Sequence, residues 1–276
     1  MFNIAQMKRV VKLLLIIISP YIIIVVGLYL AQQRIIFLPS QLPVDYEYKF
    51  NQPFEELFIT AQDGAVLNAL HFKTNDSKGV VLYFHGNSGD LSDWGHIAST
   101  FINEGYDVLM MDYRGYGKST GELREADLYS DAILLYEEAK KRFDETNITV
   151  YGRSLGATFA TYVASKNSPN KLVLETPVYN LTDIVKTKYW FLPVDLLLRF
   201  KFPSSEFISG VTCPVTVIHG TDDNVVPYKS GVKLYEAVKS EKKELVNVQG
   251  GGHNNLSEFG EYIQATERIF YHLNIL

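Results

Sequence analysis

A serine between two glycines is the residue whose setting most clearly suggests chemistry. Residues 152–156 read Gly-Arg-Ser-Leu-Gly and fit the pattern G-x-S-x-G, which a chain of this length matches by chance about once in ten. The pentapeptide directly follows an apolar run, 148–151, and opens a helical stretch, 155–166. This context predicts a nucleophile elbow, a tight turn that lifts the Ser154 hydroxyl out at the end of a strand. A side chain at either glycine would collide with the neighbouring strand or helix.

A serine hydroxyl needs a base, and the chain has six histidines. Where such an elbow lies between strand and helix, the chain order is serine, then acid, then histidine, and only His253 and His272 come late enough. His272 falls inside the terminal helical pattern, whereas His253 follows three consecutive glycines directly after the last apolar run. Because a glycine loop can curl over the nucleophile, we predict that His253 is the base.

The acid should leave the preceding strand end, where the run 215–218 leads into a loop that carries Asp222 and Asp223. Adjacent residues on a turn point in different directions, so only one of the two can reach His253. The residues alone leave both open. Three other carboxylates lie in an insertion and are weaker candidates: Asp183, Asp195 and Glu206.

Two backbone donors are needed for the oxyanion of an acyl-transfer reaction. We expect one at Leu155, directly after the serine and at a helix N-terminus. The other is expected at Asn87, in the glycine-containing loop 85–89 that follows an apolar run. His85 and His219 lie in no ligand-spaced cluster, so we expect no metal.

Nucleotide and nucleic-acid binding are both disfavoured. Residues 117–119 read Gly-Lys-Ser, like the end of a phosphate loop, but Asp112 stands where the first glycine of that motif is required. A carboxylate there would repel phosphate. The net charge of −5 also argues against a nucleic-acid partner, which needs a basic face.

The elements that must position these residues alternate along the chain. A hairpin signal comes first, with Asp63-Gly64 as the turn between two short β-type runs. Apolar runs and helical stretches then alternate, which predicts an α/β fold with a mostly parallel sheet covered by helices. The expected strands are 56–60, 66–72, 80–84, 108–111, 148–151, 172–174, 215–218 and 245–248, and the main expected helices are 123–143, 155–166, 228–240 and 257–273.

Residues 177–210 interrupt this alternation and are too long for a simple strand–helix connection. We expect a small cap. Its apolar stretch, 189–200, admits two interpretations: the side chains pack on the ends of the sheet, or they line an acyl pocket or touch a bilayer.

The N-terminal segment carries no charge from Leu13 to Ala31. As a helix it would span about 28 Å at ~1.5 Å per residue, close to the ~30 Å hydrocarbon core. A cleaved signal peptide is the alternative, but bulky Tyr29 stands near the end of the run, where small residues are wanted. We therefore expect an uncleaved transmembrane anchor over 10–31.

The remaining boundaries follow from this anchor. We expect a short cytoplasmic tail at 1–9, a semi-extended linker at 32–54, and a catalytic domain at 55–276 with its cap at 177–210. Three basic residues precede the apolar run and one follows it closely, which favours a single-pass protein with its domain on the non-cytoplasmic side.

Five segments, taken in order, resemble the α/β-hydrolase superfamily: 84–87, 112–119, 152–156, 219–227 and 252–253. More narrowly, the chain is similar to the branch with one N-terminal membrane helix and a minimal cap, which includes bud-emergence-type proteins and eukaryotic protein depalmitoylases. The resemblance implies an eight-stranded sheet, no cofactor and hydrolysis of an acyl bond. It also implies Ser154, Asp223 and His253 as the triad, with Asn87 and Leu155 as oxyanion donors.

These observations predict a membrane-anchored serine hydrolase that cleaves an ester or thioester, with a lipid or an acylated protein as the substrate. A serine peptidase or aminopeptidase on the same fold is the alternative, although no amine clamp can be identified in the sequence. A non-catalytic binding protein is disfavoured, because it would not need a complete triad. Since every predicted catalytic residue follows the linker, we expect a protein lacking residues 1–34 to hydrolyse soluble esters.

Overall fold

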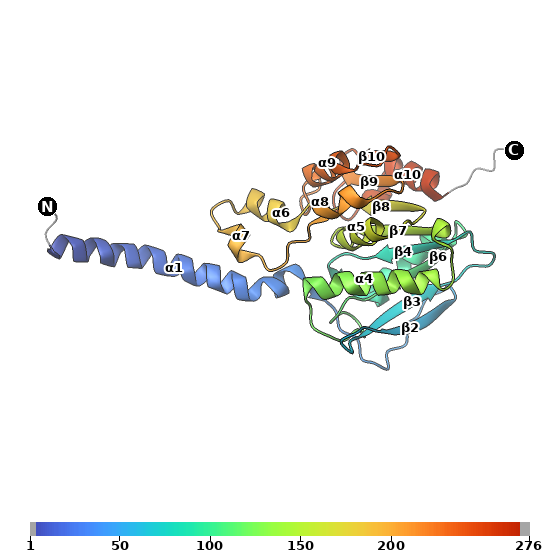
Figure 1. Cartoon of the computed structure of the whole chain (residues 1–276), viewed down its shortest axis with the longest axis horizontal. Coiled ribbons are helices and arrows are strands. Elements are labelled where there is room, and N and C mark those ends of the chain that lie inside the picture. The colour runs from blue at the N-terminus through green and yellow to red at the C-terminus, as the bar shows by residue number, and fades with distance from the viewer. Residues whose placement is uncertain (1–3, 271–276) are drawn as a thin grey trace.

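An eight-stranded sheet forms the centre of the computed structural model, which describes residues 4–270 (Figure 1). The strand order is β10-β9-β8-β7-β4-β6-β3-β2; β2 and β3 run antiparallel at one edge, and the other strands are parallel. All eight predicted strands are present and the predicted α/β-hydrolase fold is confirmed. The strands are β2 (Phe54–Thr60), β3 (Val66–Phe72), β4 (Val80–Phe84), β6 (Asp107–Met111), β7 (Ile148–Arg153), β8 (Lys171–Glu175), β9 (Val215–Gly220) and β10 (Lys243–Val248).

Helices cover both faces of the sheet, because successive side chains of a strand point to opposite faces. In β4, Val80 and Leu82 face one core, and Val81 and Tyr83 face the other. The first core is covered by α4 (Glu125–Lys140), α5 (Gly156–Lys166) and α9 (Tyr228–Ala237). The second is covered by α2 (Leu91–Trp94), α3 (Ala98–Ile102) and α10 (Gly260–Phe270), of which α2 and α3 were not expected.

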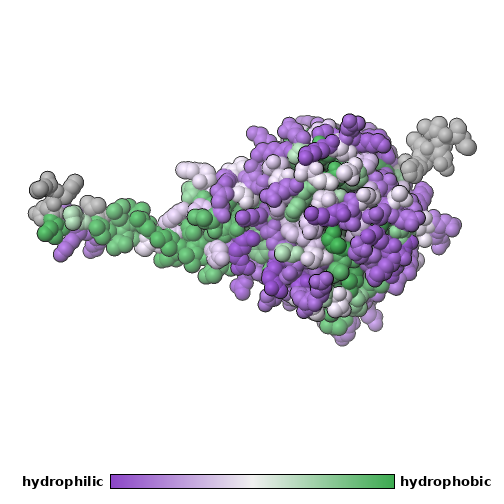
Figure 2. Space-filling view, viewed as in Figure 1, coloured by the Kyte–Doolittle hydropathy of each residue, from purple (hydrophilic) through white to green (hydrophobic). Residues whose placement is uncertain are grey.

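The N-terminal helix, α1 (Ile4–Ile36), is longer than predicted and projects from the domain (Figure 1). It is long and apolar enough to cross a membrane, and Figure 2 shows a hydrophobic surface along it. Pro20 lies inside the helix, as membrane helices tolerate.

Of the linker predicted over 32–54, residues 32–36 form the end of α1, and the chain that follows is packed on the domain. Phe37 is buried against Phe200, with ring centroids 5.0 Å apart. Strand β1 (Leu38–Pro39) pairs with β5 (Ser88–Gly89), and the Tyr48 hydroxyl donates to Asn68 Oδ1 at 2.8 Å. Phe37 and Tyr48 fix this stretch on the cap and on β3, so α1 continues into the domain without a flexible spacer.

The predicted cap consists of α6 (Leu181–Lys188), α7 (Val194–Leu197), α8 (Ser204–Phe207) and the loops between them. Helix α7 lies beside α1, and α6 packs against α7 on the side away from α1 (Figure 1). The cap therefore contacts α1 as well as the rest of the domain.

Candidate active site

Ser154 lies in the turn between β7 and α5, with a backbone φ of +55°. This left-handed conformation is costly for a residue other than glycine and persists only where the surroundings enforce it. A Cβ on Gly152 would lie 2.5 Å from Gly156 O, and one on Gly156 would lie 2.1 Å from Phe84 O. The two glycines are therefore required by the close approach of strand and helix, as predicted.

Three polar side chains from separate loops meet beside this turn. His253 Nε2 lies 3.0 Å from Ser154 Oγ, and His253 Nδ1 lies 2.7 Å from Asp223 Oδ2. Asp223 follows β9, and His253 follows β10 in the glycine loop. The backbone N–H of Asp222 donates to Gly251 O at 3.0 Å, which ties the two loops together.

The Asp223 carboxylate is buried and held by donors on both oxygens. Its Oδ1 accepts from the backbone N–H groups of Val225 and Val226, each at 2.8 Å. Its Oδ2 faces His253 and, at 3.3 Å, His219 Nε2. Burial by itself would raise the pKa of Asp223, but the hydrogen bonds from His219 and His253 outweigh burial and lower it. The carboxylate therefore stays charged beside the imidazole.

The other residues considered as the acid or the base do not lie beside Ser154 in the described structure. Asp222 is exposed and accepts a hydrogen bond from Thr221 Oγ1 at 3.2 Å. In the cap, Asp183 pairs with Lys233 and Asp195 pairs with Lys186. His272 lies outside the described residues.

The two predicted oxyanion donors border the same pocket as Ser154. A Cβ placed on Gly86 would lie 3.9 Å from the Cβ of Ser154, so the loop before Asn87 runs beside the nucleophile. The Asn87 side chain donates to Ile36 O at 2.7 Å. The backbone carbonyl of Asn87 accepts from the Tyr116 hydroxyl at 2.7 Å. These contacts hold the loop in place beside the pocket.

Arg153, next to Ser154 in the chain, joins Glu175 to the loop of His253 in a charged network that was not predicted. Arg153 Nε lies 3.1 Å from Glu175 Oε1, and its Nη2 donates to the His253 carbonyl at 3.3 Å and to Asn254 Oδ1 at 3.1 Å. Glu175 also accepts from the Tyr151 and Tyr262 hydroxyls. Arg153 and Glu175 are paired in register at the ends of β7 and β8; the sequence shows only that each of them follows an apolar run.

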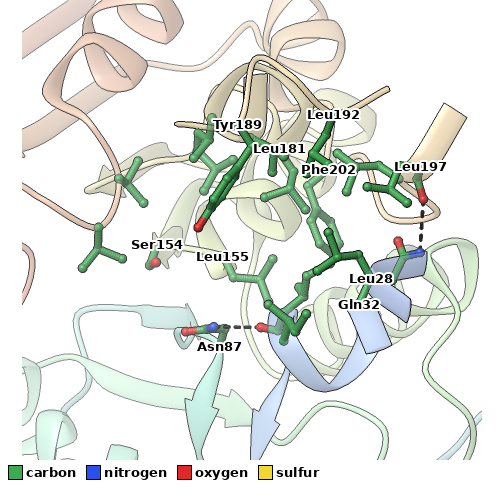
Figure 3. A pocket seen from close by; sticks show the side chains of 18 of the residues that line it. Leu28, Gln32, Asn87, Ser154, Leu155, Leu181, Tyr189, Leu192, Leu197 and Phe202 are labelled. Carbon is green, nitrogen blue, oxygen red and sulfur yellow. Dashed lines mark hydrogen bonds between the residues drawn. The ribbon is translucent and has the colours of Figure 1, made fainter. Parts of the chain in front are cut away.

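A cavity of about 480 Å³ opens beside Ser154 between the sheet, the cap and α1 (Figure 3). The Gln32 side chain closes one part of its wall, donating to Leu197 O at 3.2 Å and accepting from the Arg199 N–H at 2.7 Å. No lining residue is ionisable except Tyr189. The lining comprises Ile24, Leu28, Gln32, Ile35, Ile36, Asn87, Ser154, Leu155, Val178, Leu181, Ile184, Val185, Tyr189, Phe191, Leu192, Leu197, Leu198, Phe202, Val225 and Val226.

This lining bears on two expectations. The apolar stretch of the cap was expected either to pack on the ends of the sheet or to line a pocket or touch a bilayer. Tyr189, Phe191 and Leu192 of this stretch line the cavity. Removing residues 1–34 would take away part of the pocket wall, because Ile24 and Leu28 belong to α1. The sequence did not predict that the anchor contributes to the site.

Residues that could suggest other chemistry have structural partners. Lys118 pairs with Glu56 at 2.9 Å and lies over the Tyr48 ring. Burial raises the pKa of the Cys213 thiol to about 11. Between residues 4 and 270, no group of three or more His, Cys, Asp or Glu side chains could hold a metal ion.

Two protein-family models match the chain: one described as serine aminopeptidase, S33, over residues 75–203, and one described as phospholipase/carboxylesterase over 189–267. An uncharacterised protein of Mycobacterium tuberculosis is 34% identical over 84% of each chain. The human α/β-hydrolase domain-containing protein 17C is 31% identical over 71% of this chain and 59% of its own length. The lysophosphatidylserine lipase ABHD12 of Danio rerio is 32% identical over 59% of this chain and 48% of its own length.

Solved structures share the fold. The Pyrococcus furiosus esterase Pf2001 superposes with a TM-score of 0.67 at 21% identity, covering 85% of this chain and 96% of the esterase. An acetyl xylan esterase from Paenibacillus sp. R4 gives a TM-score of 0.68 at 18% identity, covering 82% and 87%. With this sheet order, the elbow between β7 and α5 and these relatives, the chain belongs to the α/β-hydrolase superfamily, a family of hydrolytic enzymes.

Proposed function

We propose that this protein is a membrane-anchored serine hydrolase that cleaves an ester or thioester through Ser154, His253 and Asp223. The observation that carries the proposal is the continuous hydrogen-bonded chain from Asp223 through His253 to Ser154, which ends at an apolar cavity. A strained serine supports the same conclusion, because a φ of +55° costs about 1–3 kcal/mol. A non-catalytic binding protein would have no use for that strain.

In the first step, Ser154 Oγ attacks the carbonyl carbon of the substrate while its proton passes to His253 Nε2. The carbonyl oxygen becomes an oxyanion, which the N–H groups of Leu155 and Asn87 stabilise. Asp223 keeps the imidazole in the tautomer that can accept the proton and stabilises its charged form.

Collapse of the tetrahedral intermediate breaks the bond to the leaving alcohol or thiol, which takes the proton from His253. The acyl group stays on Ser154 as a covalent ester. A water molecule then attacks this ester and gives its proton to His253, which returns it to Ser154 Oγ as the carboxylic acid leaves.

The pocket favours an acyl substrate over a peptide. One matching family model is described as an aminopeptidase, and such an enzyme must bind the charged amino group of its substrate. The cavity presents no carboxylate among its lining residues, and burying an unpaired ammonium group there would be costly. The relative ABHD12 is a lysophosphatidylserine lipase, which supports a lipid as the source of the acyl chain.

For the layout of the chain, we propose a tail at 1–9, a membrane anchor at 10–31 within α1, and a catalytic domain at 55–276 with its cap at 177–210. The basic residues before the apolar run favour a domain on the non-cytoplasmic side. Protease accessibility in spheroplasts tests this orientation: a domain protected from external protease would contradict it.

The activity is tested on the full-length protein in detergent. A fluorophosphonate should label Ser154, and a graded series of acyl esters should be hydrolysed in preference to aminoacyl amides. Preferential hydrolysis of the amides would favour the aminopeptidase, and failure to label a folded protein would contradict the serine mechanism.

A further inference from the structure

The anchor helix forms one wall of the substrate pocket. Residues from Ile24 to Ile36 of α1 line the cavity, a length of about 18 Å at ~1.5 Å per residue. Ser154 lies in the opposite wall, with Leu155 and Asn87 beside it (Figure 3). A substrate in this cavity therefore lies between the catalytic edge of the sheet and the helix proposed to enter the membrane.

The charges of α1 indicate how deep this wall lies. No charged residue occurs between Lys12 and Arg34. If the hydrocarbon core of ~30 Å begins at Lys12, it extends for about 20 residues, to Gln32. Ile24 and Leu28 then lie roughly 18 and 24 Å beyond Lys12, in the half of the bilayer nearer the domain.

The tip of the cap reaches deeper still, to about the middle of the bilayer on this scale. The Tyr21 hydroxyl donates to Phe191 O at 3.0 Å, so the cap contacts α1 about 14 Å beyond Lys12. Around this contact, Trp190 is 82% exposed and Leu196 is 86% exposed. Large apolar side chains gathered on a surface mark a membrane or partner interface, and here the neighbouring helix indicates a membrane.

One ion pair and one arginine of the cap are compatible with this position. Lys186 and Asp195 pair at 2.6 Å, which lowers the cost of placing them near lipid. The Arg199 guanidinium lies over the rings of Tyr29 and Phe200, near the level of Gln32, where the hydrocarbon core is expected to end.

We propose that the cap is embedded in the domain-side leaflet beside α1, and that the pocket opens sideways into that leaflet to receive the acyl chain of a bilayer lipid ester. This inference rests on the proposed serine hydrolase function and adds the substrate class and its route. The volume of about 480 Å³ falls in the range of roughly 300–1,000 Å³ found for small-ligand pockets, and its apolar lining suits an acyl chain. Because Ser154 is only 8% exposed, a slender lipid backbone suits the site better than an acylated protein.

The route is tested with a matched pair of leucines in α1. Leu28 lines the pocket, whereas Leu30 is 70% exposed and does not line it. Full-length protein in phosphatidylcholine vesicles is assayed on monooleoylglycerol in the bilayer and on soluble p-nitrophenyl acetate. Leu28→Trp fills part of the cavity and should lower the ratio of bilayer-ester turnover to soluble-ester turnover about tenfold; Leu30→Trp should leave both rates unchanged.

The depth of the cap is tested by fluorescence, because the chain has two tryptophans. In vesicles with brominated acyl chains, Trp190 should be quenched, and Trp190→Phe, which leaves Trp94, should lose that quenching. Equal quenching of the wild type and the variant would overturn the embedded cap.

The outcomes separate the two proposals. Loss of fluorophosphonate labelling in the folded wild type would overturn the hydrolase function itself. Normal labelling with equal effects of Leu28→Trp and Leu30→Trp on the bilayer ester would overturn only the lateral route. Hydrolysis of an S-acylated peptide in the same vesicles, without hydrolysis of the lipid ester, would overturn the lipid assignment.

Discussion

The two sides of the pocket are built differently. On the sheet side, polar groups are held by several partners each: Asp223 accepts from two backbone N–H groups and faces two imidazoles. On the side of α1 and the cap, hydrogen bonds from Gln32 and Tyr21 join two largely apolar surfaces. The sheet side contains what is needed to fix its own geometry, whereas the other side leaves large apolar side chains exposed.

This difference indicates a division of roles. Chemistry requires atoms held to within a few tenths of an ångström, and redundant hydrogen bonds from a rigid sheet supply that precision. Binding of a flexible acyl chain requires an apolar wall of adequate size, and a lipid environment can help to hold such a wall. We therefore expect substitutions on the sheet side to lower turnover of every substrate, and substitutions on the α1 side to discriminate between substrates.

The largest effect is expected from Ser154→Ala. Removing the nucleophile should abolish fluorophosphonate labelling and lower turnover by about 10⁴–10⁶ on short and long esters alike. Ser165→Ala, the same change made in α5 at a residue that does not line the pocket, is the matched control. Turnover that persists in the purified Ser154→Ala protein would contradict the serine mechanism.

Neutralising the acid should come next. Asp223→Asn should lower turnover by on the order of 10⁴, because the amide would favour the wrong tautomer of His253. Asp222→Asn should cost a few-fold at most, since its side chain is exposed and directed to Thr221. The two variants are compared by steady-state kinetics with matched unfolding curves, and the reverse ranking would show that the acid has been misplaced.

A smaller, uniform effect is expected from Arg153→Met. The substitution removes the contacts to Glu175 and to the carbonyl of His253, so the histidine loop loses part of its support. Misplacement of a catalytic group can cost up to about 10²; we expect a loss in kcat with little change in KM, similar for short and long esters. Arg153→Lys should restore part of the rate. A change confined to KM would instead place Arg153 in substrate binding.

The smallest effect, and the most selective, is expected from Gln32→Leu. The change leaves Leu197 O and the Arg199 N–H without their partner, and each lost hydrogen bond costs about 0.5–1.5 kcal/mol. We expect a few-fold loss of kcat/KM for long-chain esters and none for acetate esters, measured in vesicles. Gln33→Leu serves as the control. Equal losses on both esters would mean that α1 supports the chemistry as well as the binding.

The fold could be predicted because its signals are local. Apolar runs such as 80–84 are buried on both faces, and the elbow around Ser154 follows from glycine spacing beside a strand. The choice between Asp222 and Asp223 was not local, because it depends on the direction of adjacent side chains on a turn; only the family resemblance indicated Asp223.

The contribution of α1 to the pocket could not be predicted for a related reason. Gln32 and Leu197 are 165 residues apart, and nothing in either stretch signals that they meet. At the end of an apolar run, Gln32 has the sequence features of an interfacial residue, yet it is only 5% exposed. The same stretch was assigned to a linker, because its prolines suggested an extended chain.

The continuity of α1 into the domain has a mechanical consequence. The helix runs unbroken to Ile36. The Ile36 carbonyl accepts a hydrogen bond from the Asn87 side chain, which joins the proposed oxyanion loop directly to the end of α1. With α1 in a bilayer, as proposed, Ser154 would be held at a fixed height relative to the membrane. The proposed hydrolase would then cleave only those ester or thioester bonds that lie at this distance from the membrane.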